Sequence, residues 1–264
     1  MKQLLDKVAY VTGAGGGIGR ALALSFAAEG ARIAVVDQKA EAVNAVAEQI
    51  KAAGGVALPL VVDVTDVAGV PDSIARVHAT LGPLDILVNN AGITDSKHRQ
   101  VAELPLETWE RILRVNVTGA FLCAQAVIPT MRQRRKGNII NVTSLLGVWR
   151  MAHPGDAPYC ASKAALEALT DVLAKELRRD LINVNSLCPH TKLDTGFFAH
   201  LPPDERRGLD DPSVLAEPAV FLAALEPGTL TGLSLADLWW RKNPAYRDYL
   251  ITEHAVLARQ GTRA

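Results

Sequence analysis

The chain has 264 residues, 49% of them hydrophobic, and its 28 basic side chains balance 28 acidic ones. A chain of this length and apolar content can bury one large core, so we expect residues 1–240 to form a single domain and residues 241–264 to extend it. The net charge of zero indicates neither a nucleic acid nor a membrane surface as partner.

The cysteines and the apolar runs indicate the cellular compartment in which the protein is expected. Cys123, Cys160 and Cys188 form no metal-ligand spacing, and their odd number without a signal peptide predicts reduced thiols in the cytoplasm. The first strand is expected to begin by Val8, which leaves no room for a targeting segment, and no apolar run approaches the roughly eighteen residues of a membrane span. The basic run 132–136 is expected to close a helix rather than to bind nucleic acid.

A glycine loop separates the first predicted strand from the first predicted helix. Residues 8–11 are typical of a short buried strand, and an amphipathic helical pattern follows the segment 12–19, TGAGGGIG. Glycines at such a point let the backbone approach a pyrophosphate, and the helix amino terminus faces the negative charge. Because the spacing is GxxxGxG rather than the common GxGxxG, a flexible turn is the alternative when the loop is considered alone.

The second predicted strand bears on the choice of cofactor. Residues 31–36 predict this strand, and Asp37 ends it. A carboxylate there binds the adenosine ribose 2′-hydroxyl and would repel a phosphate. Gly16 and Gln38 stand where an arginine would bind such a phosphate, so the pattern favours NAD over NADP, although Lys39 keeps NADP open.

Strands and helices alternate along the rest of the chain. Further strands are predicted at residues 56–64, 84–90, 138–144, 182–188 and 232–238. Two helices carry apolar stripes at Val43, Val46, Ala47 and Ile50 and at Val70, Ile74, Val77 and Leu81. The nearly continuous apolar run 56–64 predicts a strand covered on both faces, and Pro218 is expected to split the helix after Pro212. This alternation predicts a single-domain α/β fold, a Rossmann-type doubly wound parallel sheet with helices on both faces.

A tyrosine and a lysine four residues apart follow the predicted strand 138–144. Tyr159 and Lys163 share one helix face, and Ser144 ends the strand before them. A close ammonium together with a cationic cofactor ring would lower the pKa of a phenol from about 10 towards 7. Alone, such a pair is usually an ordinary amphipathic pair. Beside the glycine loop, it predicts a phenol, an ammonium and a hydroxyl around one carbonyl or carbinol.

Together these motifs resemble the classical short-chain dehydrogenase/reductase family over roughly residues 5–195. The segment 12–19 is similar to its cofactor loop, and residues 89–92 are similar to the motif after its fourth strand. The residues that match its catalytic tetrad, in order, are Asn116, Ser144, Tyr159 and Lys163. The resemblance implies cofactor contacts from Gly13, Gly17, Ile18, Gly19, Asp37, Asp63, Val64, Asn90, Ala91, Gly92, Tyr159, Lys163, Pro189 and Thr191.

The resemblance also implies a mechanism. Tyr159 would take the hydroxyl proton, Lys163 would keep the phenolate accessible and bind the nicotinamide ribose, and Ser144 would hold the reacting oxygen. Asn116 would position a water that links Lys163 to solvent. A strand-end hydroxyl and a locally satisfied helix amide are the alternative readings of Ser144 and Asn116.

Two stretches after residue 188 depart from the family pattern. His190 stands where the family has the glycine of a Pro-Gly pair, so either the loop is reshaped or the imidazole lines the substrate pocket. The sequence leaves open whether Thr191, Asp194 or Thr195 meets the nicotinamide carboxamide. The segment 196–211 stands where the family has a mobile lid and is short and charged, which favours a compact, polar or alicyclic substrate. The expected substrate-pocket residues are Ser144, Leu146, Trp149, His153 and His190.

The end of the chain departs from the pattern as well. Trp239 and Trp240 stand in place of paired glycines, and the tail 241–264 has apolar residues at helical spacing. The tryptophans could anchor a subunit contact, close the pocket or cover the edge of the sheet. The resemblance implies a homotetramer or a homodimer.

The sequence thus predicts an oxidoreductase that transfers a hydride between NAD(H) and a small-molecule secondary alcohol or ketone. An NADPH-dependent ketoreductase of the 3-oxoacyl type is the nearest enzymatic alternative. The alternative from another class is a nucleotide-sensing protein that has kept the fold without turnover.

Overall fold

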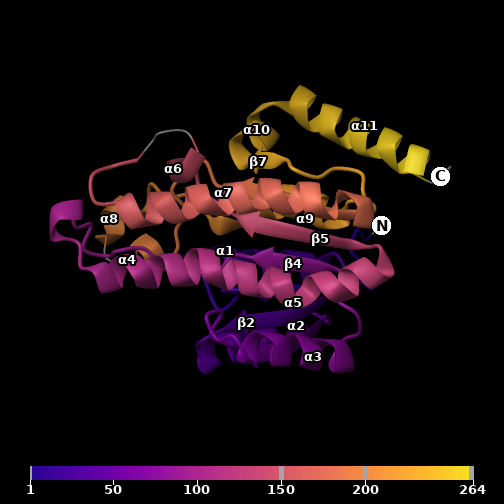
Figure 1. The fold of residues 1–264 in the computed structure, drawn as a ribbon, viewed down its shortest axis with the longest axis horizontal. Coiled ribbons are helices and arrows are strands. Elements are labelled where there is room, and N and C mark those ends of the chain that lie inside the picture. Colours follow the sequence, from indigo (N-terminus) through magenta and orange to yellow (C-terminus); the bar gives the residue numbers. More distant parts are fainter. Residues whose placement is uncertain (1, 149–151, 199–200, 262–264) are drawn as a thin grey trace.

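Seven parallel strands form one sheet in the order β3-β2-β1-β4-β5-β6-β7 in the computed structural model, which describes residues 2–148, 152–198 and 201–261 (Figure 1). The strands are β1 Val8–Thr12, β2 Arg32–Asp37, β3 Val56–Val61, β4 Ile86–Asn89, β5 Gly137–Val142, β6 Ile182–Cys188 and β7 Ser234–Ala236. The strand order reverses between β1 and β4, which is the point where doubly wound sheets bind ligands.

Helices cover both faces of this sheet, so the predicted fold class is confirmed. The main helices are α1 Gly17–Ala28, α2 Ala40–Ala52, α3 Gly69–Thr80, α4 Leu106–Leu113, α5 Gly119–Arg134, α7 Ala157–Leu177, α9 Ala216–Ala224 and α11 Pro244–Gly261. Shorter elements are α6 Leu145–Val148, α8 Pro203–Arg206, α10 Asp237–Lys242 and the turns η2 Arg114–Thr118, η4 Gly196–Phe198 and η5 Pro212–Leu215. One core cluster includes side chains of α1, α2 and α9, and the other those of α3, α5 and α7. The two apolar stripes predicted from the sequence therefore face the sheet.

The strand β3 corrects one expectation. Val56 is 49% exposed and Val61 is 59% exposed, so the prediction of a strand covered on both faces is wrong. The reason is its place in the sheet, because β3 is an edge strand that pairs only with β2. The strand also ends at Val61, three residues before the predicted end. An apolar run alone does not distinguish an edge strand from a central one.

The helix predicted to split at Pro218 is intact. Pro218 is the third residue of α9, in the first turn, where backbone N–H groups have no partner within the helix. The proline therefore removes no helical hydrogen bond. The preceding turn, η5, runs directly into α9.

The two tryptophans have different environments. The strand β7 is shorter than predicted because α10 begins at Asp237, and this short helix turns Trp240 into the protein. Trp240 is 2% exposed, and its ring centroid lies 4.8 Å from that of Phe221 in α9. Trp239 is 49% exposed. Trp240 thus completes the core of its own chain beyond β7, whereas Trp239 faces outward.

A continuous helical stretch, Leu106–Arg134, is long and apolar enough to cross a membrane by length and composition, which the sequence analysis did not anticipate. It comprises α4, the π-helical turn η2 and α5. The apolar side chains of α5 have a local explanation, because Cys123, Val127 and Met131 are fully buried in the core against the sheet. Of the most apolar window in this stretch, 39% is buried, so the core-facing side chains account for part of its apolar character.

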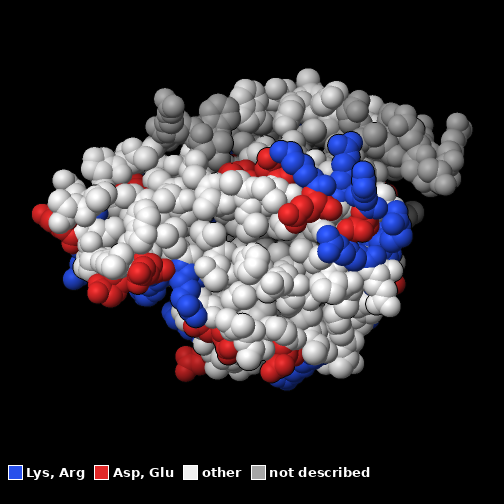
Figure 2. Space-filling model, viewed as in Figure 1, with Lys and Arg blue, Asp and Glu red and all other residues white. Residues whose placement is uncertain are grey.

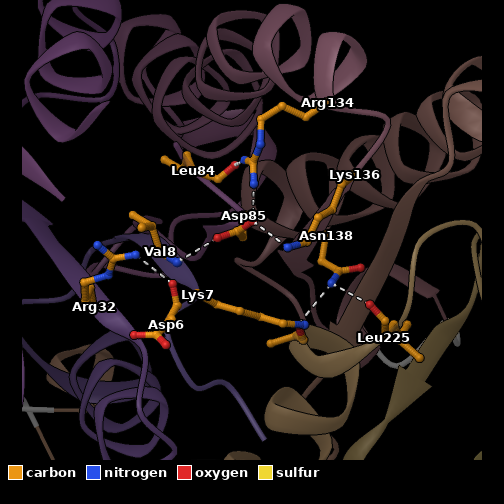
Figure 3. Close-up of polar contacts among 11 residues, drawn as sticks. Asp6, Lys7, Val8, Arg32, Leu84, Asp85, Arg134, Lys136, Asn138 and Leu225 are labelled. Carbon is orange, nitrogen blue, oxygen red and sulfur yellow. Dashed lines mark hydrogen bonds and ion pairs between the residues drawn. The ribbon is translucent and has the colours of Figure 1, made fainter. Parts of the chain in front are cut away.

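A polar cluster closes the edge of the sheet where the strands begin (Figure 3). Asp85 is 6% exposed and accepts hydrogen bonds from the backbone of Val8 at 3.0 Å and from Arg134 at 2.7 Å, and Lys136 lies 3.2 Å away. The helix α5 ends in this cluster, and Arg135 takes a left-handed conformation as it leaves the helix. The basic run thus closes a helix, as predicted.

We expect Asp85→Asn to lower the free energy of unfolding by about 3 kcal/mol, because it removes one member of a buried charge network. Burial raises the pKa of Asp85, but the hydrogen bonds from Val8 and Arg134 and the charge of Lys136 together hold it below its usual value. The carboxylate therefore stabilises the fold above the unfolded pKa of about 3.8, and this contribution is lost as the pH falls further. Urea unfolding at pH 7 and at decreasing pH measures both effects.

The matched control is Asp180→Asn. Asp180 pairs with Arg132 at 2.8 Å, but their side chains are 28% and 51% exposed, so the loss should stay below about 1 kcal/mol. Equal effects of the two substitutions would show that burial does not set the strength of the Asp85 network.

Candidate active site

The glycine loop after β1 is shaped by close backbone approaches. Gly13 and Gly17 have φ of +63° and +50°, the left-handed region that favours glycine. A Cβ at Gly19 would overlap the carbonyl oxygen of Gly13 and approach the amide of Asn90. At Gly16 a Cβ would meet nothing within 4 Å. The loop therefore needs glycine at position 19 for internal packing, and it forms an open cradle at the start of α1.

Residues after β4 support this cradle. The hydroxyl of Thr12 accepts hydrogen bonds from the backbone N–H groups of Asn90 at 2.9 Å and Ala91 at 3.0 Å, and it donates to Val88 O. The side-chain amide of Asn90 donates to the carbonyls of Thr12 at 2.9 Å and Gly13 at 3.3 Å. Asn90 and Ala91 were predicted as cofactor contacts. In the structure their hydrogen bonds hold the glycine loop in place.

The two predicted adenosine-binding acids lie at the carboxyl ends of β2 and β3. Asp37 accepts hydrogen bonds from the backbone of Gly15 and Lys39, both at 3.2 Å, so its carboxylate faces the glycine loop. Asp63 accepts from the backbone and hydroxyl of Thr65, both at 2.8 Å, next to the buried Val64. Both carboxylates therefore lie at the carboxyl-end edge of the sheet, where doubly wound sheets bind ligands.

Tyr159, Lys163 and Ser144 come together beyond the carboxyl end of β5. Lys163 is 4% exposed, donates to Val142 O at 2.8 Å and has its Nζ 5.6 Å from the centre of the Tyr159 ring. Ser144 lies two residues after β5 and forms a hydrogen bond with the Tyr159 hydroxyl. The phenol, ammonium and hydroxyl therefore occupy one site, as the spacing predicts.

Burial disfavours the charged forms of both Tyr159 and Lys163. Burial raises the pKa of Tyr159, and the hydrogen bond with Ser144 only partly offsets it. Burial lowers the pKa of Lys163 to about 8, against the opposing effects of Cys188 and Glu167. The expected depression of the tyrosine pKa is thus not produced by the protein groups alone. A further positive charge beside the phenol is needed to favour the phenolate at neutral pH.

Asn116 joins three segments around the site. It is 1% exposed in the π-helical turn η2, its oxygen accepts from Ile93 N at 2.8 Å, and its amide donates to Ile93 O and to Ser162, both at 2.9 Å. A Cβ at Gly92 would lie 3.4 Å from Asn116 and 3.6 Å from Lys163, at ordinary van der Waals distance, so Gly92 lies beside both side chains. The Asn116 amide hydrogens are both used within the protein, which leaves one lone pair on its oxygen for a further partner.

The loop after β6 carries His190 in an ordinary backbone conformation. None of the described non-glycine residues with positive φ lies in this loop, so His190 causes no left-handed strain. Its backbone N–H donates to Asp237 at 2.6 Å, and its Nδ1 is buried without a partner among the described residues. The hydroxyl of Thr191 donates to Asp210 at 2.8 Å, whereas Thr195 lies directly against Gly17 of the glycine loop. Of the threonines considered from the sequence, Thr195 is therefore the one beside the cradle.

An aromatic residue that the sequence analysis missed faces the reactive tyrosine. Phe197, in the turn η4, lies edge-on to Tyr159, with ring centroids 5.8 Å apart and ring planes at 83°. A phenylalanine among the charged residues 192–211 was the available signal. The contact places an apolar wall beside the phenol.

The other predicted pocket residues have mixed positions. Leu146 is half-buried in α6 and its backbone N–H donates to Ser144 at 3.3 Å, whereas His153 is exposed in the loop before α7. Pro189 is half-buried just after β6. Trp149 lies outside the described residues. Among the described residues, Leu146 is thus held at the site, and His153 faces outward.

Known proteins with similar sequences are dehydrogenases and reductases. A family model described as short chain dehydrogenase matches residues 7–206. The 2,5-dichloro-2,5-cyclohexadiene-1,4-diol dehydrogenase LinX of Sphingobium indicum is 36% identical over 88% of this chain and 95% of its own. The 3-oxoacyl-[acyl-carrier-protein] reductase FabG of Thermotoga maritima is 34% identical over 87% of this chain and 95% of its own. The 2-(S)-hydroxypropyl-CoM dehydrogenase 3 of Xanthobacter autotrophicus is 34% identical, over 89% and 96%.

Solved structures agree with these sequences. A short-chain type dehydrogenase/reductase from Mycobacterium marinum superposes with a TM-score of 0.82 at 34% identity, over 88% of this chain and 94% of its own. A protein from Beutenbergia cavernae, described as an NAD(P)-dependent gluconate 5-dehydrogenase with bound NADP, has a TM-score of 0.80 at 32% identity, over 90% and 98%. The family match, the shared fold and the assembled site agree, and the chain belongs to the short-chain dehydrogenase/reductase family of oxidoreductases.

Proposed function

We propose that this protein is an NAD-dependent dehydrogenase of compact secondary alcohols, working reversibly on the corresponding ketones. The observation that carries the proposal is the meeting of Tyr159, Lys163 and Ser144 beside the glycine cradle. The relatives that act on a cyclic diol and on a hydroxypropyl group support an alcohol as substrate.

The residues of the site divide the work of alcohol oxidation. Ser144 holds the reacting oxygen by a hydrogen bond, and Tyr159 removes the hydroxyl proton as general base. The ammonium of Lys163 favours the phenolate, because opposite charges attract strongly in a poorly solvated site. Asn116 fixes the turn η2 against α7 and so keeps Lys163 in place. A bound NAD supplies the acceptor for the hydride of the carbinol carbon.

The residues at the edge of the sheet fit a dinucleotide. The cradle between Gly13 and Gly19 opens at the amino terminus of α1, where backbone N–H groups and the helix dipole favour a pyrophosphate. Asp37 favours a free ribose 2′-hydroxyl over a 2′-phosphate, which would bring two negative charges together. We therefore propose NAD rather than NADP.

Phe197 supports a compact substrate with an apolar or alicyclic part. Its ring lies edge-on to the Tyr159 ring, so the carbon skeleton next to the reacting oxygen would pack against it. The segment that follows is short and charged, which favours a compact substrate with polar groups. Reduction of 3-oxoacyl thioesters with NADPH remains the second candidate, because FabG reductases are among the relatives.

We also propose that the functional protein is a homotetramer or homodimer in the cytoplasm. Figure 2 shows that the middle of the face formed by α5 and α7 carries almost no charged side chains. On the same side of the sheet, Leu106 of α4, Phe121 of α5 and Val172 of α7 are 63%, 44% and 49% exposed. A second copy of the chain would cover this apolar surface. The three unpaired cysteines support a reducing compartment.

We expect Tyr159→Phe to lower kcat/KM for alcohol oxidation by about 10³-fold or more while NADH binding stays within about twofold, because only the proton acceptor is removed. NADH formation from cyclohexanol, cis-cyclohexane-1,2-diol and a 3-hydroxyacyl thioester gives the rates, and NADH fluorescence gives the binding. Tyr246→Phe, a half-buried tyrosine of α11, should leave both unchanged. Full activity of Tyr159→Phe would disprove the mechanism, and a clear preference for the thioester would favour the second candidate.

We expect Gly19→Ala to weaken NADH binding by about tenfold or more, because the added methyl group cannot be placed without moving Gly13 or Asn90. Gly208→Ala is the control away from the loop. Gly208 is exposed and its Cβ would come no closer than 3.7 Å to its neighbours, so its affinity for NADH should match the wild type. Equal affinities of the two variants would contradict a cofactor site in this loop.

We expect Asp37→Ser to reduce the preference for NAD over NADP, measured as the ratio of kcat/KM values, by about tenfold or more, because the repelling carboxylate is removed. Glu41→Gln removes an exposed carboxylate from the first turn of α2 and should leave the ratio unchanged. A wild-type preference for NADPH would overturn the proposed cofactor.

A further inference from the structure

The helix α10 begins with a carboxylate that is completely buried. Asp237 is 0% exposed, accepts a hydrogen bond from the backbone of His190 at 2.6 Å and pairs with Arg241, one turn later, at 2.9 Å. A buried carboxylate needs such partners, because an unpaired charge in this position would cost several kcal/mol. Asp237 therefore links α10 to the loop after β6.

Arg241 also contacts Asp210, which lies about twenty residues after His190 in the chain. Its guanidinium lies 3.4 Å from the carboxylate of Asp210, which also accepts the hydroxyl of Thr191 at 2.8 Å. The backbone of Asp210 pairs with residues 192–194, because its N–H donates to Lys192 O and its carbonyl accepts from Asp194 N. We call the described residues 189–198 and 201–211 the β6–α9 segment. Arg241 thus holds both ends of this segment through two carboxylates.

The β6–α9 segment carries the groups that face the active site. Thr195 lies against Gly17 of the cofactor cradle, and Phe197 lies edge-on to Tyr159. Arg206 pairs with Asp194 at 2.6 Å, which ties the described part after residue 200 to the part before it. A displacement of the segment would therefore move its contacts with both the cradle and the phenol.

The base of these contacts is rigid. Trp240, which lies between Asp237 and Arg241 in α10, is 2% exposed and packs on Phe221 of α9. Trp240 therefore fixes α10 to the core, and Arg241 extends from this helix towards the β6–α9 segment. Few apolar side chains of that segment are buried. The buried side chain of Leu193 is the apolar anchor among its described residues.

We propose that Arg241 is a positioning residue of the active site, which holds the β6–α9 segment through Asp237 and Asp210 so that Thr195 and Phe197 face cofactor and substrate. The effect on ligands rests on the proposed function, whereas the holding of the segment does not. Arg241 itself touches no reacting group.

Two measurements on the full chain test this proposal. Trypsin cleavage after Arg206 and Arg207, followed by mass spectrometry, reports opening of the segment, since these side chains are 39% and 79% exposed within it. NADH fluorescence titration reports the cofactor site. We expect Arg241→Met to raise both the cleavage rate and the Kd for NADH by about tenfold, because a charged hydrogen-bonding partner is lost.

Four further variants separate positioning from general stability. Asp210→Ala leaves the buried pair of Asp237 and Arg241 in place, and it should raise cleavage and Kd in the same direction. Combining it with Arg241→Met should add less than the product of the two single effects. Arg241→Lys should restore part of the loss. Arg132→Met breaks a pair at the opposite edge of the sheet and should match the wild type in both measurements.

The outcomes are distinct. Faster cleavage together with weaker NADH binding supports the proposal. Faster cleavage with unchanged NADH binding, or no change in either, overturns it. If the wild type binds no NADH, the proposed function fails and with it the cofactor part of the inference, while the cleavage rates still decide whether Arg241 holds the segment.

Discussion

Parallel pairing of β1, β4 and β5 brings three chain segments to one edge of the sheet, where the backbone groups beyond the last paired residues need other partners. The register pairs Val11 with Val88 and Asn89 with Asn141, so the residues that follow these strands emerge side by side. The hydroxyl of Thr12 and the amide of Asn90 satisfy the exposed backbone groups there. The sheet and two polar side chains therefore hold the glycine cradle in shape, and a ligand that binds it need not order it.

The same burial that organises the site disfavours both of its charges. Burial raises the pKa of Tyr159 and lowers the pKa of Lys163, so the low-polarity setting favours a neutral phenol and weakens the ammonium. A positive nicotinamide ring beside the phenol would reverse this balance for the tyrosine. Binding of the oxidised cofactor would therefore favour the removal of the alcohol proton that follows it. Because both side chains are buried, a charge that binds beside them would change their pKa values strongly.

The sequence predicted those features that depend on local pattern. The strands, the glycine loop and the Tyr159–Lys163 pair could be recognised because each depends on spacing within a few residues. The exposure of β3 could not be predicted, because an apolar run is compatible with both an edge strand and a central strand of a sheet. The intact helix at Pro218 depended on where the helix begins. Phe197 was found only in three dimensions, and only the structure distinguished Thr195 from the neighbouring residues considered with it, since the partners of both are more than thirty residues away in the chain.

The helix α10 contacts the β6–α9 segment through one buried hydrogen bond and one partly exposed ion pair, which differ in how strongly solvent and salt weaken them. The bond from His190 to Asp237 is enclosed and poorly screened, so it should persist under most solution conditions. The pair of Arg241 and Asp210 is longer, and its side chains are 29% and 42% exposed, so salt and water weaken it. The start of the β6–α9 segment is therefore fixed more firmly than its end.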